Sequence, residues 1–252
     1  MVLKGYAGEA KFLKKYIISV ILVMAVSYSV YLFLDDDAIM DLAWDENGVV
    51  ESGTAIFFIA ASIVFFLCFK ANKNLLLLGL GLLMFVAAGE ELSWGQHIFN
   101  FHTPESIDKM NVQHEFNFHN LEFFNGVYKG GIKKLWYQRL FEINMLFRLF
   151  SVGFGIALPL YFYYIQWRIK MPAKLRMPVM PVTVGVFFLL NWIVFYCIKY
   201  YLLPKGKIKD FYSTPAEIFE MVAAFIFFIA SLYFYRMRKL DFGGKDIKQI
   251  QL

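Results

Sequence analysis

The sequence predicts an all-α protein built as a polytopic bundle of six transmembrane helices, and two observations carry this prediction. Of the 252 residues, 59% are hydrophobic, with 29 Phe and 15 Tyr, which is more apolar surface than a soluble domain of this length can bury. The apolar residues also fall into runs long enough to cross a hydrocarbon core about 30 Å thick. We therefore predict one integral membrane domain over residues 1–252.

Six apolar runs are candidate spans. The first follows several lysines, but its long aromatic run has no clear small-x-small cleavage site, so we interpret it as an uncleaved anchor rather than a signal peptide. Cys68 and Cys197 both lie inside such runs and are interpreted as buried thiols. The predicted spans lie near 16–34, 53–69, 75–92, 140–165, 182–203 and 215–235.

The basic residues predict an orientation. Of the 25 Lys and Arg residues, 15 lie at the N-terminus, in the second and fourth loops and in the C-terminal tail, whereas the first loop, DDDAIMDLAWDENG, has none. The positive-inside rule then places both termini in the cytoplasm, although lysines in the third and fifth loops weaken the asymmetry. Because the basic residues lie between apolar runs, the net charge of +5 does not indicate a nucleic-acid partner.

The third run ends in two adjacent carboxylates, Glu90 and Glu91. At about 1.5 Å per helical residue, Glu90 lies roughly 25 Å from Lys73, just inside the far boundary of the membrane. Carboxylates at this depth are costly and usually functional. The alternative is that both are interfacial and that Trp94 is an ordinary belt aromatic.

Two other helices place ionisable groups at the same depth. Glu217 and Glu220 lie about 29 and 24 Å from Arg236, and Arg148 lies about 30 Å from Arg168. We predict an outward-facing polar site whose catalytic residues are Glu90, Glu91, Glu220 and Arg148. Two structural alternatives stay open. Thr214-Pro215-Ala216-Glu217 matches a capping box, and Arg148 could serve only to neutralise a glutamate.

Several polar side chains accompany these groups. Asn144 begins a polar stripe that continues through Arg148 at helical spacing, so we expect it to face the bundle and bind substrate. If the third helix continues, Glu90 shares a face with Ser93, Trp94 and His97, which suits a ligand pair or an acid–base pair.

All four histidines lie in the third loop or at its start. We predict that residues 93–139 form a structured outer loop, with a short helix that begins at Thr103-Pro104. The segment HEFNFH has one residue too many for the zinc-protease motif, so the metalloprotease hypothesis is rejected. Metal ligation from irregular backbone stays open beside simple interfacial histidines, and His97, His114 and His119 are the candidate ligands of a divalent metal such as zinc.

The blocks GEELSWGQHIF and NVQHEFNFHNL resemble a pattern found in uncharacterised bacterial multi-spanning membrane proteins, over roughly residues 89–121. The resemblance implies the bacterial inner membrane as location. It attaches no activity, but it draws attention to Glu90, Glu91, Ser93, Trp94, Gly95, Gln96, Asn117, His119 and Asn120. Among these residues we predict substrate-binding roles for Ser93, Trp94, Gln96 and Asn117.

Three functions remain in competition. The first is a metal-assisted hydrolase or transferase that acts on a lipid or lipid-linked substrate, with a glutamate as general base. The second is a cation- or proton-coupled transporter or channel. A one-sided acidic site suits an enzyme better than a carrier with inverted repeats. The third is a non-catalytic subunit of a membrane assembly.

Overall fold

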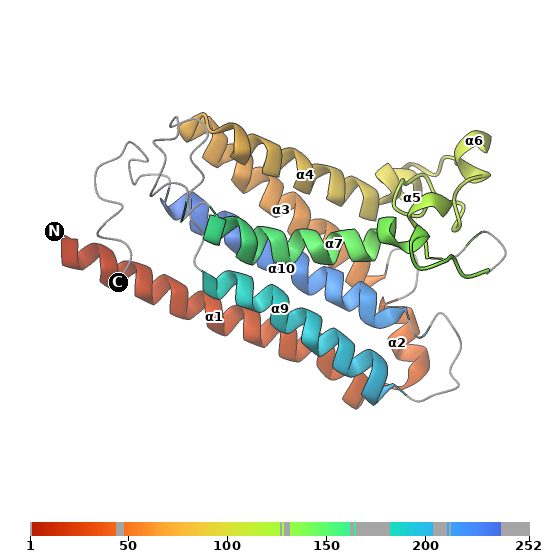
Figure 1. Cartoon of the computed structure of the whole chain (residues 1–252), viewed down its shortest axis with the longest axis horizontal. Coiled ribbons are helices and arrows are strands. Elements are labelled where there is room, and N and C mark those ends of the chain that lie inside the picture. The colour runs from red at the N-terminus through yellow and green to blue at the C-terminus, as the bar shows by residue number, and fades with distance from the viewer. Residues whose placement is uncertain are drawn as a thin grey trace.

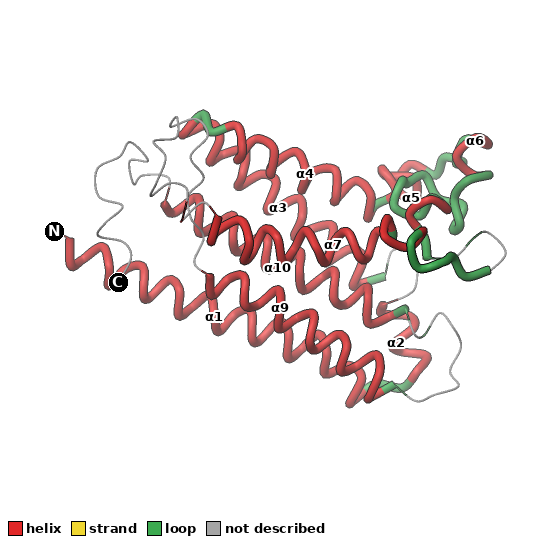
Figure 2. The backbone as a smooth tube through the Cα atoms, viewed as in Figure 1, coloured by secondary structure: helices red, strands yellow, loops and turns green. Residues whose placement is uncertain are grey.

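The structure, a computed structural model, describes residues 2–43, 48–126, 128, 132–161, 164, 182–203, 211 and 213–237, without the side chains of residues 2–12, 97, 182, 183 and 237. Most of the described residues are helical and none lies in a β-strand, as Figure 2 shows. The long helices are α1 (Val2–Phe33), α3 (Val49–Asn72), α4 (Leu75–Glu91), α7 (Ile143–Val152), α9 (Val182–Cys197) and α10 (Thr214–Met237). π-Helical turns extend α7 and α9, namely η4 (Gly153–Ala157) and η6 (Ile198–Leu202).

Among the described residues, five helices are long and apolar enough to cross a membrane, which is compatible with a multi-pass membrane protein. They cover Leu13–Phe33, Val49–Asn72, Ile143–Tyr161, Val184–Leu202 and Thr214–Arg236. The predicted third span is a helix as well, but α4 has only 17 residues and rises about 25 Å, which is shorter than the others. The six-span arrangement and the cytoplasmic termini therefore remain predictions.

The helix boundaries differ most from the predicted spans in α1 and α7. The predicted run 16–34 is only the second half of α1, because the segment before it is rich in good helix formers such as Ala, Leu, Lys and Glu and contains no proline. The fourth span was predicted from residue 140, yet residues Gln138–Phe141 form the 3₁₀ turn η3 and α7 begins at Ile143. The predicted end of that span at residue 165 lies outside the described residues.

The helices form a bundle around α10 (Figure 1). Helices α3 and α4 lie on one side of α10, α1 and α9 lie on the other, and α7 lies alongside. The first turn of α1 and the last turn of α10 lie at one end. The opposite end, which we call the loop end, carries the short helices α2 (Asp36–Ala43), α5 (Gln96–Phe99) and α6 (Glu105–Asp108).

A two-residue turn joins α3 to α4 and sets their antiparallel packing. Lys73 adopts a left-handed conformation, φ 54°, and its N–H donates to the Phe69 carbonyl over 2.7 Å, which caps α3. The Asn74 side chain then accepts a hydrogen bond from the N–H of Leu76 over 2.9 Å, which caps α4. This tight turn places the other end of α4, with Glu90 and Glu91, at the loop end.

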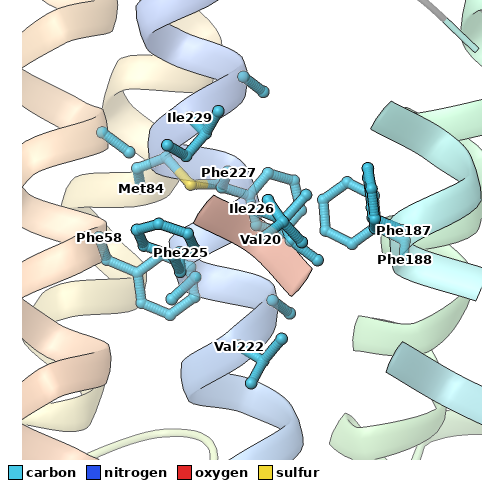
Figure 3. Packing of buried hydrophobic residues seen from close by; sticks show 14 of the residues in the cluster. Val20, Phe58, Met84, Phe187, Phe188, Val222, Phe225, Ile226, Phe227 and Ile229 are labelled. Carbon is cyan, nitrogen blue, oxygen red and sulfur yellow. The ribbon is translucent and has the colours of Figure 1, made fainter. Parts of the chain in front are cut away.

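The apolar core is aromatic and centred on α10 (Figure 3). The Phe227 ring is fully buried, and its centroid lies 4.7 Å from that of Phe188, 5.1 Å from that of Phe154 and 5.5 Å from that of Phe150. Of the apolar stretch of α10, 67% is buried, against 17% of that of α1. Because most of α10 is enclosed by other helices, we expect the polar groups in its first turns to face protein groups or a site rather than lipid.

Buried polar contacts tie α1, α9 and α10 together toward the loop end. Asn191 on α9 is fully buried, donates to the Phe219 carbonyl over 2.9 Å and accepts from the Tyr28 hydroxyl over 2.8 Å. The hydroxyls of Tyr31 and Thr214 are 2.8 Å apart. These satisfied bonds fix the first turns of α10 against α1 and α9.

Candidate functional site

The face that we predicted Glu90 to share with His97 requires α4 to continue past its two carboxylates. It does not continue. It ends at Glu91, and three successive residues then adopt left-handed backbone: Ser93 with φ 43°, Trp94 with φ 53° and Gly95 with φ 83°. Such conformations are unfavourable for Ser and Trp, and tertiary contacts must hold them. The turn reverses the chain, so Trp94 packs back onto Gly89, where any side chain would meet the indole ring.

Glu90 is held by hydrogen bonds on both carboxylate oxygens. Its Oε1 accepts from the indole N–H of Trp94 over 2.7 Å. Its Oε2 accepts from the backbone N–H groups of Phe118 and His119, over 2.7 and 2.9 Å. The Nδ1 atom of His119 lies 3.6 Å from the same oxygen. Glu90 therefore joins the end of α4 to the distant half of the loop of residues 93–139.

A second carboxylate, Glu115, organises the loop in the same way. It is 7% exposed, and its Oε2 accepts from the Ser93 hydroxyl over 3.0 Å and from the amides of Asn117 and Asn120. Asn111 donates to Asn117 and accepts from the backbone N–H groups of residues 113 and 115. These buried polar groups, which we call the loop network, satisfy one another.

Gln96 completes the connection between the two sequence blocks that the resemblance singled out. Its Oε1 accepts from the N–H of Phe116 over 2.6 Å, and its amide donates to the Thr103 hydroxyl over 3.0 Å. That hydroxyl in turn donates to the His114 carbonyl. The predicted short helix is present as α6, but Pro104 is its N-cap rather than Thr103, because Thr103 makes these loop contacts instead.

Three further carboxylates at this end, on α4 and α10, differ from Glu90 and Glu115 in their contacts. Glu91 lies close enough to Glu217, Glu220 and Glu51 to interact with them electrostatically, and Glu217 also interacts with Glu220. All four side chains are partly exposed. Within the described residues no hydrogen bond or ion pair holds Glu91, Glu217 or Glu220. We call these three residues the acidic cluster.

The capping-box alternative for Glu217 finds no support in these contacts. The Thr214 hydroxyl donates to the Phe211 carbonyl over 2.9 Å and meets the Tyr31 hydroxyl, so in the described residues it does not cap the N–H of Glu217. Glu217 thus belongs to the acidic cluster.

Arg148 lies near the acidic cluster without an ion pair to it. It interacts electrostatically with Glu220, yet no carboxylate among the described residues pairs with it directly. Its guanidinium lies over aromatic rings instead, 4.7 Å from the Phe195 centroid and 5.9 Å from those of Tyr196 and Phe219. Its Nε atom is buried and has no hydrogen-bond partner in the described part of the chain.

The predicted metal ligands are not brought together by the described contacts. The ring of His114 bonds to Asp108 over 2.8 Å, while His119 lies beside Glu90 and interacts with Glu220. The structure does not describe the side chain of His97. Among the described residues, no group of three or more His, Cys, Asp or Glu side chains could hold a metal ion.

The structure thus divides the predicted site residues into two sets. Ser93, Trp94, Gln96 and Asn117 bond within the protein, together with Glu90, whereas Glu91, Glu220 and Arg148 keep unused polar atoms. His119 lies between the two sets, because it contacts Glu90 and interacts with Glu220. Asn144 is partly exposed on the first turn of α7, the helix that carries Arg148.

Sequence reasoning missed Glu51, Glu115, Trp192 and Lys199. The depth count that found Glu90 would also have found Glu51, because it lies in the first turn of α3 at the loop end. Glu115 entered the sequence analysis only as part of HEFNFH, the segment that does not match the zinc-protease motif. A buried polar side chain in a loop produces no periodic pattern in the sequence, so only the tertiary structure shows which groups it bonds.

A hollow of about 550 Å³ is lined by residues between Lys109 and Phe141 and is separate from the acidic cluster. Lys109, Glu122, Lys134 and Tyr137 are among its lining residues, and no member of the acidic cluster is. The Lys134 ammonium donates to the Glu122 and Phe123 carbonyls, so part of this lining is occupied by internal bonds.

Comparisons with protein families, curated proteins and solved structures find no match to this chain. Its function must therefore be argued from its own residues.

Proposed function

We propose that the protein is a multi-pass enzyme of the bacterial inner membrane, a hydrolase or transferase that acts on a lipid or lipid-linked substrate at the outer boundary. One observation carries the proposal. Glu220 of the acidic cluster interacts electrostatically with Arg148, and neither this carboxylate nor the Arg148 Nε has a hydrogen-bond partner among the described residues. Carboxylates can transfer protons, and a guanidinium can stabilise negative charge that develops in a transition state.

The roles follow from the neighbours of each group. Glu220 interacts with both Arg148 and His119, so it is placed to act as general base on a water or hydroxyl nucleophile that these donors orient. Glu91 and Glu217 extend the acceptor surface. These roles use the carboxylates alone, and assistance by a divalent metal stays a prediction.

An assay of lipid conversion tests the proposal. Purified protein is reconstituted in vesicles of phosphatidylethanolamine and phosphatidylglycerol, and the lipids are followed by mass spectrometry. We expect time-dependent conversion by the native protein and a loss of about 100-fold or more in Glu220→Gln, the usual scale for removing a general base. Glu105→Gln is the matched control, because Glu105 is exposed and paired with Lys109. Lipids left unaltered by the native protein contradict the enzyme hypothesis.

A cation- or proton-coupled transporter is the second candidate. It is favoured by the convergence of Glu51, Glu91 and Glu217 from three different helices, α3, α4 and α10. Flux driven by an imposed proton or sodium gradient across the same vesicles, abolished by Glu91→Gln while the lipids stay intact, would favour this candidate over the enzyme.

The orientation is tested by labelling. In a Cys197→Ser background, Gln113→Cys lies at the loop end and Lys70→Cys at the other end, and both positions are exposed. An impermeant thiol reagent added outside intact cells should label position 113 and reach position 70 only after permeabilisation. The reverse pattern would place the site in the cytoplasm.

A further inference from the structure

Two cations meet over one aromatic ring where α7 and α9 approach the loop end. The Arg148 guanidinium lies 4.7 Å from the Phe195 centroid, and the Lys199 ammonium lies 5.5 Å from it. Lys199 belongs to the π-helical turn η6. π-Helical turns are rare and are found often at functional sites, because the extra residue re-aims the side chains of the turn.

The carboxylates around these cations do not neutralise them directly. Lys199 interacts electrostatically with Arg139, Arg148 and Glu142. Glu142 is paired with Arg139, over 3.0 Å, and Glu220 interacts with Arg148 only at longer range. In the described part of the chain, therefore, neither Arg148 nor Lys199 has an ion-pair partner.

Two buried donors in this region lack acceptors. Arg148 Nε and the indole Nε1 of Trp192 are both buried with no hydrogen-bond partner in the described part of the chain. Both side chains lie against Tyr196, the guanidinium 5.9 Å and the indole 6.0 Å from its ring centroid. Buried donors in native proteins are nearly always satisfied by protein, water or ligand. One of these two donors belongs to the Arg148 cation itself, so together with Lys199 and Trp192 it calls for a group that only accepts.

The surroundings favour a lipid as the source of that group. Tyr196 and Tyr200 stack with centroids 5.4 Å apart, and Tyr200 and Tyr201 are exposed near the end of the apolar stretch Val184–Leu202. Tyrosines gather where a membrane meets water, at the level of lipid head groups. A phosphate at that level would lie beside the two cations.

We propose that Arg148, Lys199 and Trp192 form a binding niche for a phosphate group, most directly that of a membrane phospholipid. Arg148 and Lys199 supply positive charge and charge-assisted donors, Trp192 supplies a neutral donor, and Phe195 holds both cations in place. The niche shares Arg148 with the proposed active site, whereas Lys199, Trp192 and Phe195 take no part in the proposed chemistry, and lipid binding requires no turnover.

Native mass spectrometry of the full-length protein in detergent tests the niche. Phosphatidic acid is titrated against a galactosyl diacylglycerol with the same acyl chains, which lacks phosphate. We expect preferential binding of phosphatidic acid, with a Kd about tenfold higher in Arg148→Gln and Lys199→Gln and about threefold higher in Trp192→Phe, as for the loss of charged and neutral hydrogen bonds. Lys109→Gln, at an exposed lysine of α6's C-cap, should bind as the native protein does.

Competition by inorganic phosphate and glycerol phosphate separates the sources. If these competitors displace the lipid at millimolar concentration, the niche is supported and also binds soluble phosphates. If they do not displace it, the niche binds the phosphate of a lipid alone. Equal binding of the two lipids, or native affinity in both Lys199→Gln and Trp192→Phe, overturns the niche. These two variants keep the test decisive if Arg148→Gln does not fold. Because binding is measured without turnover, its failure is distinguishable from failure of the proposed activity.

Discussion

Glu90 and Glu91 are adjacent in sequence, yet their environments are opposite. Glu90 accepts three hydrogen bonds and fixes the loop of residues 93–139 onto α4, while Glu91 faces other carboxylates and has no bonded partner among the described residues. A step of one residue along the helix separates their directions by about 100°. The difference teaches that depth in the membrane identifies an important carboxylate without saying whether it holds the structure together or remains available for chemistry.

Removal of Glu90 should have the largest effect on stability. Glu90→Ala deletes an acceptor of three hydrogen bonds and releases residues 118 and 119 from α4. We expect the free energy of unfolding in mixed detergent micelles to fall by about 3 kcal/mol. Glu105→Ala, on the exposed surface of the loop, should change it little. Equal effects of the two substitutions would show that Glu90 has no structural role.

The second-largest loss of stability is expected from a substitution in the loop network. Asn117 is 2% exposed and bonds to Ser93, Glu115 and Asn111, so Asn117→Ala leaves buried donors and acceptors unpaired. We expect a loss of about 2 kcal/mol in the same unfolding measurement and faster proteolysis of the loop. Gln113→Ala, at an exposed position, provides the comparison. Resistance of the loop to proteolysis in Asn117→Ala would contradict the network.

A smaller loss is expected when only one bond to Glu90 is removed. Trp94→Phe keeps an aromatic ring beside Gly89 and deletes the indole N–H that donates to Glu90. The expected cost is about 1.5 kcal/mol, the lower value for a hydrogen bond to a charged group. Trp136→Phe is the control, because Trp136 is 77% exposed. If both variants unfold alike, the bond to Glu90 contributes nothing.

The smallest expected effect has the opposite sign. Glu91→Gln removes one of several like charges and breaks no bond of the described structure, so we expect stability to rise by about 1 kcal/mol. The gain should shrink when Glu217→Gln is already present, since both substitutions relieve the same repulsion. A loss comparable to that of Glu90→Ala would mean that both carboxylates are structural.

Apolar periodicity and composition predicted the all-helical fold and the positions of its long helices, because these depend on local propensity and on the length of each apolar run. Helix depth also predicted that Glu91, Glu220 and Arg148 lie at one end of the bundle. Each of these properties is additive along the chain and can be read one segment at a time.

Only the tertiary structure decided which polar groups are used. The left-handed turn at Ser93–Gly95, the bonds from residues 118 and 119 to Glu90, and the meeting of Arg148 and Lys199 over Phe195 all join segments distant in sequence. Hydrogen bonds and ring contacts act over a few ångströms and carry no periodic signal. The sequence by itself therefore determined where polar groups gather, and the packing of the loop onto the helices determined which of them remain free to bind a ligand.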